Sequence, residues 1–219
     1  MSPDAHATFL FADIAGFTAL TEAHGDEHAV QLVEEFAQVV QAELPSVGGE
    51  YVKTVGDALM LRVPDPAEAI RLGLWITRDA MQGHNAPSVR AGGNHGSAID
   101  RGGDYFGGTI NVAARVSALA GGGELLVTGQ TAALAPDLPG VLYESRGRQV
   151  LRNVSEPLEI FAVVRVDETA EQLPIDPVCQ MAVDPEHAVG RLLLDEKAYY
   201  FCSLTCAAAF AGQPERYRT

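Results

Sequence analysis

The sequence predicts an α+β fold in which helices pack on a mixed β-sheet. Short apolar runs alternate with longer segments whose apolar residues recur at helical spacing. Turns that contain glycine or proline separate these segments. With 219 residues, the chain is long enough to bury a full hydrophobic core and to carry a second, smaller unit. We therefore expect helices layered on a sheet, followed by a small appendage.

In the first half of the chain, predicted strands and helices alternate. The segment 26–44 is expected to be a helix that Pro45 ends, and the segment 66–81 a helix with Pro66 near its start. The apolar positions of the first helix are Val30, Val33, Phe36, Ala37, Val40 and Leu44. Strands are expected over 7–12, 47–52, 58–63 and 89–99.

The second half predicts one more helix, three strands and a change in composition. The helix is expected over 109–120, and the strands over 124–128, 141–143 and 158–166. The stretch 167–174 is polar, acidic and ends in proline, which is typical of a linker. The expected organisation is a large domain over 1–166, a linker over 167–174 and a small domain over 175–219.

The charge balance excludes several partners. The chain has 15 basic and 29 acidic residues, a net charge of −14. Non-specific nucleic-acid binding and docking on anionic membranes both need a basic surface. No apolar run approaches the roughly 18 residues that span a bilayer, and the N-terminal segment lacks the features of a signal peptide. We therefore expect a soluble cytoplasmic protein without nucleic-acid or membrane partners.

Two segments place carboxylates where divalent cations could bind. Asp13 closes the apolar run of FLFADIAGFT (9–18), and Asp57 follows the Gly56 turn of YVKTVGDALML (51–61). Carboxylates from neighbouring strands are suitable ligands for Mg²⁺ or Mn²⁺, and the amides of the small-residue turn after Asp13 could cradle phosphate oxygens. The alternatives are a helix cap for Asp13 and a simple turn residue for Asp57.

A third segment, GDYFGGTINVAARV (103–116), places Asn111 and Arg115 four residues apart. On a helix these side chains share one face. An amide and a guanidinium that converge there suit a phosphate or ribose oxygen. The alternative is a solvated amphipathic helix that follows a glycine turn.

Together the three segments resemble the catalytic domain of class III nucleotidyl cyclases. That family carries F-x-D-I-x-G-F-T, K-x-x-G-D and D-x-x-G-x-x-x-N-x-x-x-R, in this order. The resemblance covers roughly residues 7–166 and implies a ferredoxin-like core extended by further strands. The side chains that match the catalytic set of the family are Asp13, Lys53, Asp57, Asp104, Asn111 and Arg115.

The resemblance implies an adenylate cyclase, which converts ATP to 3′,5′-cyclic AMP and pyrophosphate. It implies that Asp13 and Asp57 hold two Mg²⁺ or Mn²⁺ ions per active site and that Asn111 and Arg115 are catalytic. In the family, a Lys/Asp pair that binds the base accompanies the use of ATP. The residues implied to contact the substrate are Lys53, Asp104, Phe17 and Thr18.

The resemblance also implies a homodimer with two equivalent sites at a head-to-tail interface. Asp13 and Asp57 of one chain would face Lys53, Asp104, Asn111 and Arg115 of the other.

The three cysteines, Cys179, Cys202 and Cys206, all follow the expected linker. An odd number in a cytoplasmic protein favours metal or redox use over a disulfide framework. The segments IDPVCQMAVDP and AYYFCSLTCAAAFAGQPERY (within 175–217) resemble YHS and TRASH-type metal-binding domains. Three thiolates favour a thiophilic metal such as Zn²⁺ or Cu⁺. Candidates for the fourth ligand are Asp176, Met181, His187 or water, and the alternative is three structural cysteines in a small core.

Three classes of function remain open from the sequence. The first is an adenylate cyclase that metal binding to the tail regulates. The second is a catalytically silent, cyclase-like dimer that serves as a nucleotide-binding or interaction module. The third is a metal sensor or carrier that uses the cyclase fold to dimerise.

Overall fold

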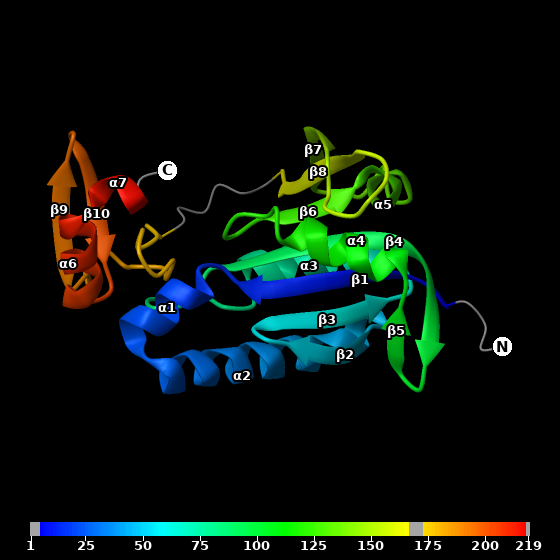
Figure 1. The fold of residues 1–219 in the computed structure, drawn as a ribbon, viewed down its shortest axis with the longest axis horizontal. Coiled ribbons are helices and arrows are strands. Elements are labelled where there is room, and N and C mark those ends of the chain that lie inside the picture. Colours follow the sequence, from blue (N-terminus) through cyan, green and yellow to red (C-terminus); the bar gives the residue numbers. More distant parts are fainter. Residues whose placement is uncertain (1–4, 167–172, 218–219) are drawn as a thin grey trace.

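The computed structural model describes residues 5–166 and 173–217, which form one large mixed sheet with helices on both faces and a small hairpin (Figure 1). The expected α+β class is therefore confirmed. The sheet order is β2-β3-β1-β4-β6-β8-β7, and β5 pairs with the end of β4. Its strands are β1 Ala5–Ile14, β2 Glu50–Val55, β3 Ala58–Val63, β4 Val89–Arg101, β5 Asp104–Phe106, β6 Leu125–Thr128, β7 Val141–Gln149 and β8 Leu158–Arg165.

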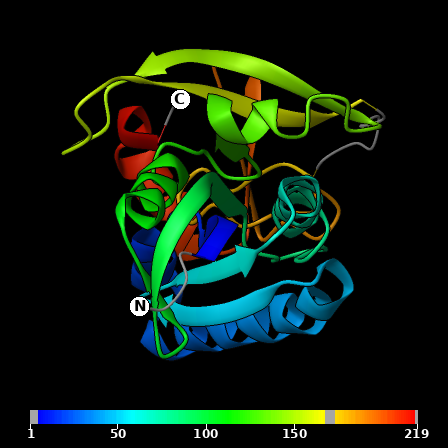
Figure 2. The same cartoon turned by 90° about the vertical axis from the view of Figure 1, so that its right-hand side faces the viewer.

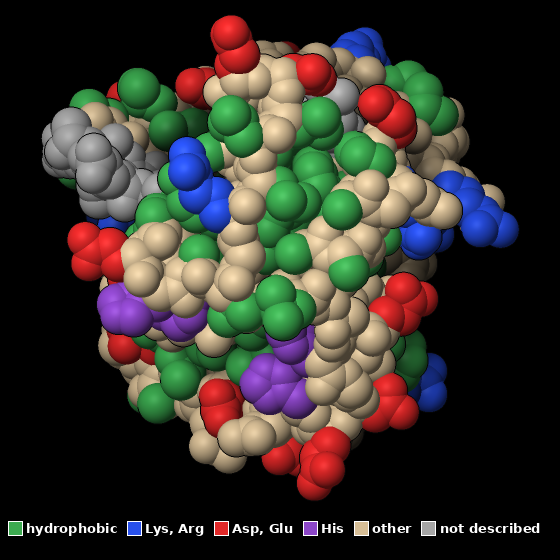
Figure 3. All heavy atoms as spheres, turned by 90° about the vertical axis from the view of Figure 1, so that its left-hand side faces the viewer, with side chains coloured by type: hydrophobic (Ala, Val, Ile, Leu, Met, Phe, Trp, Pro, Cys, Tyr) green, Lys and Arg blue, Asp and Glu red, His purple; other side chains and the backbone are tan. Residues whose placement is uncertain are grey.

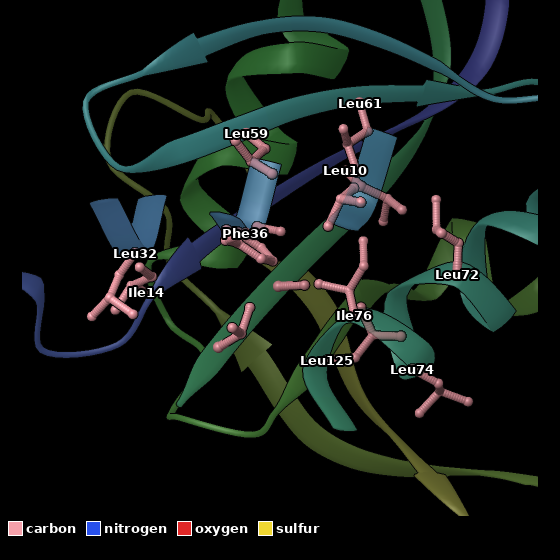
Figure 4. Close-up of a cluster of buried hydrophobic side chains, with 14 of the residues drawn as sticks. Leu10, Ile14, Leu32, Phe36, Leu59, Leu61, Leu72, Leu74, Ile76 and Leu125 are labelled. Atoms are coloured by element: carbon pink, nitrogen blue, oxygen red, sulfur yellow. The ribbon is translucent and has the colours of Figure 1, made fainter. Parts of the chain in front are cut away.

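Helices cover the two faces of this sheet differently, as Figures 1 and 2 show. Side chains alternate along a strand, so Leu10 and Ile14 of β1 face α2 and α3, whereas Phe9 and Phe11 pack with residues of α4. Figure 4 shows the larger cluster, which includes Leu10, Ile14 and Phe36. The helices of this part are α1 Phe17–His24, α2 Asp26–Glu43, the 3₁₀ helix η1 Leu44–Val47, α3 Pro66–Arg78, α4 Gly108–Ser117 and α5 Gly129–Ala133.

The buried face of α2 differs from the expected one. Val30 was expected to be buried, but it is 53% exposed. The residues of α2 that are buried are Ala29, Leu32, Phe36 and Val40. These positions keep the spacing of three or four residues that places side chains on one helical stripe. At about 100° per residue, Val33 lies at one edge of this stripe and packs partly buried against the core, whereas Val30 lies further around on the same side and faces solvent.

Several boundaries also differ, and two of them move site residues. The strand expected over 47–52 begins at Glu50, because the 3₁₀ helix takes up Val47, so Lys53 lies within β2. The strand expected over 7–12 extends to Ile14, so Asp13 lies within β1. The short strand expected over 141–143 is β7, which reaches Gln149.

Helix α4 lies close against β4 because glycine replaces larger residues in the strand. A Cβ atom on Gly92 would lie 2.0 Å from the backbone nitrogen of Ser117, the last residue of α4. No side chain fits in that space, so contact between the backbones of Gly92 and Ser117 sets how closely α4 packs on the sheet.

We predict that Gly92→Ala lowers the free energy of unfolding by about 2 kcal/mol or more, because the added methyl group must displace helix backbone. Gly108→Ala is the matched control: a Cβ there meets nothing within 4 Å, and alanine favours the helix. Urea unfolding of both variants measures the difference. Equal stability of the two variants would contradict the close packing of α4.

The tail over 173–217 packs at the end of the sheet where β1 finishes (Figure 1). Its elements are β9 Gly190–Leu194, β10 Lys197–Phe201, α6 Leu204–Gly212 and α7 Pro214–Tyr217. Buried tail residues such as Val178 and Phe201 belong to the same hydrophobic cluster as Leu10 and Phe36. Most of the expected linker, 167–172, lies outside the described residues. No helix in the two described stretches is long and apolar enough to cross a bilayer.

Backbone hydrogen bonds join the tail to the segment that precedes β4. The amide of Ala182 donates to the carbonyl of Ala86, and the amide of Asn85 donates to the carbonyl of Ala182, both at 2.8 Å. The amide of Ser88 donates to Gln180 at 3.1 Å, and the carbonyl of Ser88 accepts from Ala15 at 2.8 Å. The tail is therefore bonded to a segment that itself supports the loop after β1.

Candidate functional site

Asp13 lies near the end of the central strand β1, on the face that α4 covers, because it follows Phe9 and Phe11 in the alternation. The side chain forms an ion pair with Arg90, its cross-strand neighbour on β4. Asp13 is only 9% exposed, and this burial raises the pKa of its carboxyl group above the ordinary value of 3.8, although Arg90 opposes the effect.

Asp57 lies in the two-residue turn between β2 and β3, where Gly56 has a φ of +67°. The registers place Leu59 of β3 opposite Ala12 of β1, so the turn lies beside the end of β1. The charge of Asp57 also raises the pKa of Asp13. The structure thus brings together the two carboxylates that were expected to bind divalent cations.

Lys53 and Asp104 form an ion pair. The Nζ atom of Lys53 on β2 lies 2.8 Å from Oδ2 of Asp104 at the start of β5, and 5.5 Å from the ring centroid of Phe106. The hydrogen bond from Lys53 lowers the pKa of Asp104 below its ordinary value. Both side chains are more than a third exposed, so the pair presents a donor and an acceptor to a ligand.

Asn111 and Arg115 lie one turn apart on α4, away from its buried residues Ile110 and Ala113. Within the described residues, no hydrogen bond or ion pair joins either side chain to the Asp13–Asp57 pair or to the Lys53–Asp104 pair. The Nε atom of Arg115 is buried and has no hydrogen-bond partner. Within one chain the six expected residues therefore form three separate pairs: the two carboxylates, the Lys53–Asp104 ion pair, and Asn111 with Arg115 on α4.

We predict that Lys53→Ala raises the pKa of Asp104 toward 3.8, because the hydrogen bond that favours the carboxylate is removed. In the unmodified chain this ion pair stabilises the fold above the unfolded pKa, and its contribution disappears as the pH falls through the lowered folded pKa. Carboxyl-detected NMR titration measures both values. Lys197, the only other lysine, provides the control Lys197→Ala, which should leave Asp104 unchanged; an equal shift in both variants would refute the assignment.

The loop after β1 carries the other two expected substrate contacts. Gly16 has a φ of +69° and precedes α1, whose first residues are the half-buried Phe17 and the exposed Thr18. A Cβ atom on Gly16 would lie 2.8 Å from Cγ of Gln180 in the tail. The tail therefore touches the loop that joins Asp13 to α1.

The three cysteines converge with one histidine that the sequence did not identify. The ligand atoms of Cys179, Cys202, Cys206 and His24 all lie within 4.8 Å of one another. His24 is the last residue of α1 and so lies outside the tail. Hydrogen bonds from the other two thiols lower the pKa of Cys206, which favours a thiolate there.

Two of the candidates named for the fourth ligand, Asp176 and His187, are not members of this ligand group. Asp176 is fully buried and its two carboxylate oxygens accept from the amides of Val178 and Cys202, so it orients the cysteine segments. His187 is exposed and pairs with Asp184 at 2.7 Å. The sequence could not single out His24, because this residue lies far from the first cysteine, Cys179, along the chain and no spacing pattern links the two. Histidine side chains gather on the face that carries the tail (Figure 3).

A family profile identifies the large domain. The profile described as the adenylate and guanylate cyclase catalytic domain matches residues 1–163. The chain belongs to this family. A pH-sensitive adenylate cyclase of Mycobacterium tuberculosis (strain CDC 1551 / Oshkosh) is 34% identical over 161 residues, which are 72% of this chain and 40% of that protein. An adenylate cyclase of Streptomyces coelicolor (strain ATCC BAA-471 / A3(2) / M145) is 34% identical over 110 residues, which are 50% of this chain and 29% of that protein.

Solved cyclase structures share the fold. The adenylyl cyclase CyaB from P. aeruginosa superposes with a TM-score of 0.65 at 24% identity, over 76% of this chain and 97% of that one. The mixed sheet with its helices is thus the cyclase fold. The chain spans less than half the length of the two curated relatives described above, and the family profile ends before the tail.

Proposed function

We propose that this chain is an adenylyl cyclase that converts ATP to 3′,5′-cyclic AMP and pyrophosphate. The observation that carries the proposal is the ion pair of Lys53 and Asp104, in which Nζ and Oδ2 lie 2.8 Å apart and both side chains stay accessible. The named adenylate cyclases among the relatives support this choice of substrate.

The Lys53–Asp104 pair suits adenine better than guanine. The ammonium group of Lys53 would donate to N1 of adenine, and the carboxylate of Asp104 would accept from the 6-amino group. Guanine has a donor at N1 and an acceptor at O6, so both contacts would be mismatched, and a mismatched buried polar contact is costly. The two side chains are bonded to each other, and the ammonium keeps further donors and the carboxylate further lone pairs for the base.

Asp13 and Asp57 have the chemistry of a site for Mg²⁺ or Mn²⁺. They are hard carboxylate ligands at the end of β1 and in the β2–β3 turn. Burial is the main cause of the raised pKa of Asp13 and the nearby charge of Asp57 adds to it, so bound cations would favour both carboxylates. We infer that they hold two such ions, which when bound neutralise the triphosphate and acidify the ribose 3′-hydroxyl. Arg90, which pairs with Asp13, would keep that carboxylate oriented.

In the reaction, the ribose 3′-oxygen bonds to the α-phosphorus, the bond from that phosphorus to the bridging oxygen breaks, and pyrophosphate leaves with the bonding electrons. The hydroxyl proton passes to solvent. Arg115 would stabilise the charge on the α-phosphoryl oxygens, and Asn111 would orient the ribose. The amides at the start of α1, beside Phe17 and Thr18, would hold phosphate oxygens.

A head-to-tail homodimer would complete this site. Within one described chain, Asn111 and Arg115 make no bond to the carboxylate pair. Ile99 and Phe106, cross-strand neighbours near Asp104, are 51% and 50% exposed, as expected of apolar residues that a second copy covers. We infer that the carboxylate pair of one chain faces the other four residues of its partner.

The first test removes one cation ligand. Asp57→Ala is expected to lower the rate of cyclic AMP formation by at least about a hundredfold, the scale on which losing one preorganised charge-stabilising group acts. Asp137→Ala, at an exposed aspartate, is the matched control and should retain full activity. Mass spectrometry of the products with Mn²⁺ and ATP measures both rates. An Asp57→Ala enzyme that keeps its activity would contradict the proposal.

The second test addresses the division of the site between chains. Asp57→Ala and Arg115→Ala homodimers are each expected to be nearly inactive, since every site lacks one residue. Mixing and subunit exchange produce heterodimers. In each heterodimer one of the two sites keeps all six residues, so activity should reappear. Native mass spectrometry verifies the exchange. Exchange without recovered activity would mean that the residues act within one chain.

The tail is positioned to regulate this site. Gln180 contacts Gly16, in the loop where the triphosphate would lie, and the Ser88 carbonyl bonds to Ala15 of the same loop. A movement of the tail would therefore change the loop directly. We infer that the state of the tail modulates the cyclase.

A further inference from the structure

We propose that His24 of the catalytic domain completes a zinc site with Cys179, Cys202 and Cys206, so that one ion fastens the tail to helix α1. The site goes beyond the cyclase activity proposed above and does not depend on it. Its ligands come from parts of the chain far apart in sequence, which meet only in the folded protein.

The spacing of the ligand atoms fits a tetrahedral ion. Zinc lies about 2.3 Å from thiolate sulfur and about 2.0 Å from imidazole nitrogen, so ligand atoms of a tetrahedral site lie about 3.5–3.8 Å apart. The sulfur of Cys202 lies 3.3 Å from that of Cys179, 3.8 Å from that of Cys206 and 3.4 Å from Nε2 of His24. The four ligands are therefore close to the required arrangement.

The surroundings favour a closed structural site over a reactive one. Cys179 and Cys206 are fully buried, Cys202 is 7% exposed, and His24 is half-buried. The carboxylate of Asp176 accepts from the amide of Cys202 at 3.0 Å, which positions that ligand as the outer partners of metal ligands do. Three thiolates and one imidazole form a common structural zinc set.

The position of His24 gives the ion a mechanical role. Helix α1 runs from Phe17 to His24, so the ion would hold the helix about 12 Å from the loop after Asp13, at 1.5 Å per residue. The other end of this helix is touched by Gln180 of the same tail. The bound ion would fix α1 at its far end while Gln180 contacts its beginning.

The deciding experiment is zinc K-edge X-ray absorption on the full chain, with zinc as the only added metal. The expected first shell is three sulfurs and one nitrogen, with the outer-shell scattering of one imidazole. In His24→Ala the imidazole scattering should vanish. Chelator competition should show a zinc affinity lower by at least about tenfold, because loss of a residue that only supports a metal ligand already costs about that much.

Two further variants keep the test decisive. His28→Ala is the matched control, because the His28 ring is a neighbour of His24, with 5.7 Å between ring centroids, but is exposed and lies outside the ligand group. It should keep the zinc and the imidazole signal. His24→Cys should bind one zinc through four sulfurs, since it replaces one ligand with another. Loss of imidazole scattering in His28→Ala, or its persistence in His24→Ala, would overturn the assignment of His24.

Hydrogen exchange tests the fastening of α1. Removal of zinc from the unmodified chain is expected to speed amide exchange over 17–24 and to leave α3 unchanged. Unaltered exchange in α1 would overturn the proposed role of the ion. A fully reduced chain, with three free thiols by titration, that takes up no zinc would overturn the site itself. All these measurements use protein without nucleotide, so their outcome is independent of cyclase activity.

Discussion

The antiparallel ladder between β1 and β4 is the constraint on which the rest of the structure depends. It runs without a break from Ala5 opposite Ala98 to Ile14 opposite Val89. It places Arg90 beside Asp13 and sets both faces of the sheet, because each strand alternates between the two helical layers. The glycine of β4 that admits α4, Gly92, lies opposite Phe11 in the same ladder. A slip of one residue would turn Asp13 toward the opposite face and away from α4.

The same end of β1 joins Asp13 to the tail. Strand β1 ends one residue after Asp13, and the loop of Ala15 and Gly16 leads into α1 and bonds to Ser88 just before β4. The tail bonds to Ser88 and contacts Gly16, while His24 at the other end of α1 joins the cysteine cluster. The tail therefore contacts this loop directly and also contacts the far end of the helix that follows it. Helix α1 therefore connects the cysteine cluster, at His24, with the loop that follows Asp13.

Sequence patterns predicted the parts of this protein that are encoded locally. The α+β class, the positions of β3, α3 and α4 within a few residues, and the closeness of Asp13 to Asp57 followed from apolar spacing, turns and family motifs. The burial of Phe36, Val40 and Leu44 also followed, but the exposure of Val30 did not, because tertiary packing decides how wide a stripe of α2 is covered. Arg90 and His24 were missed for a related reason. Their importance arises from contacts with residues distant in sequence, Asp13 and Cys202, which no local spacing reveals.

The central claim is that two carboxylates, an ion pair that reads adenine and a helix that bears Asn111 and Arg115 make this chain an adenylyl cyclase. A competition assay tests it most directly: the unmodified chain is supplied with equal amounts of ATP and GTP and with Mn²⁺, and the products are separated by mass spectrometry. The account predicts 3′,5′-cyclic AMP and pyrophosphate in equal amounts, with cyclic GMP as a minor product. Predominant cyclic GMP, or the absence of any cyclic nucleotide, would contradict it.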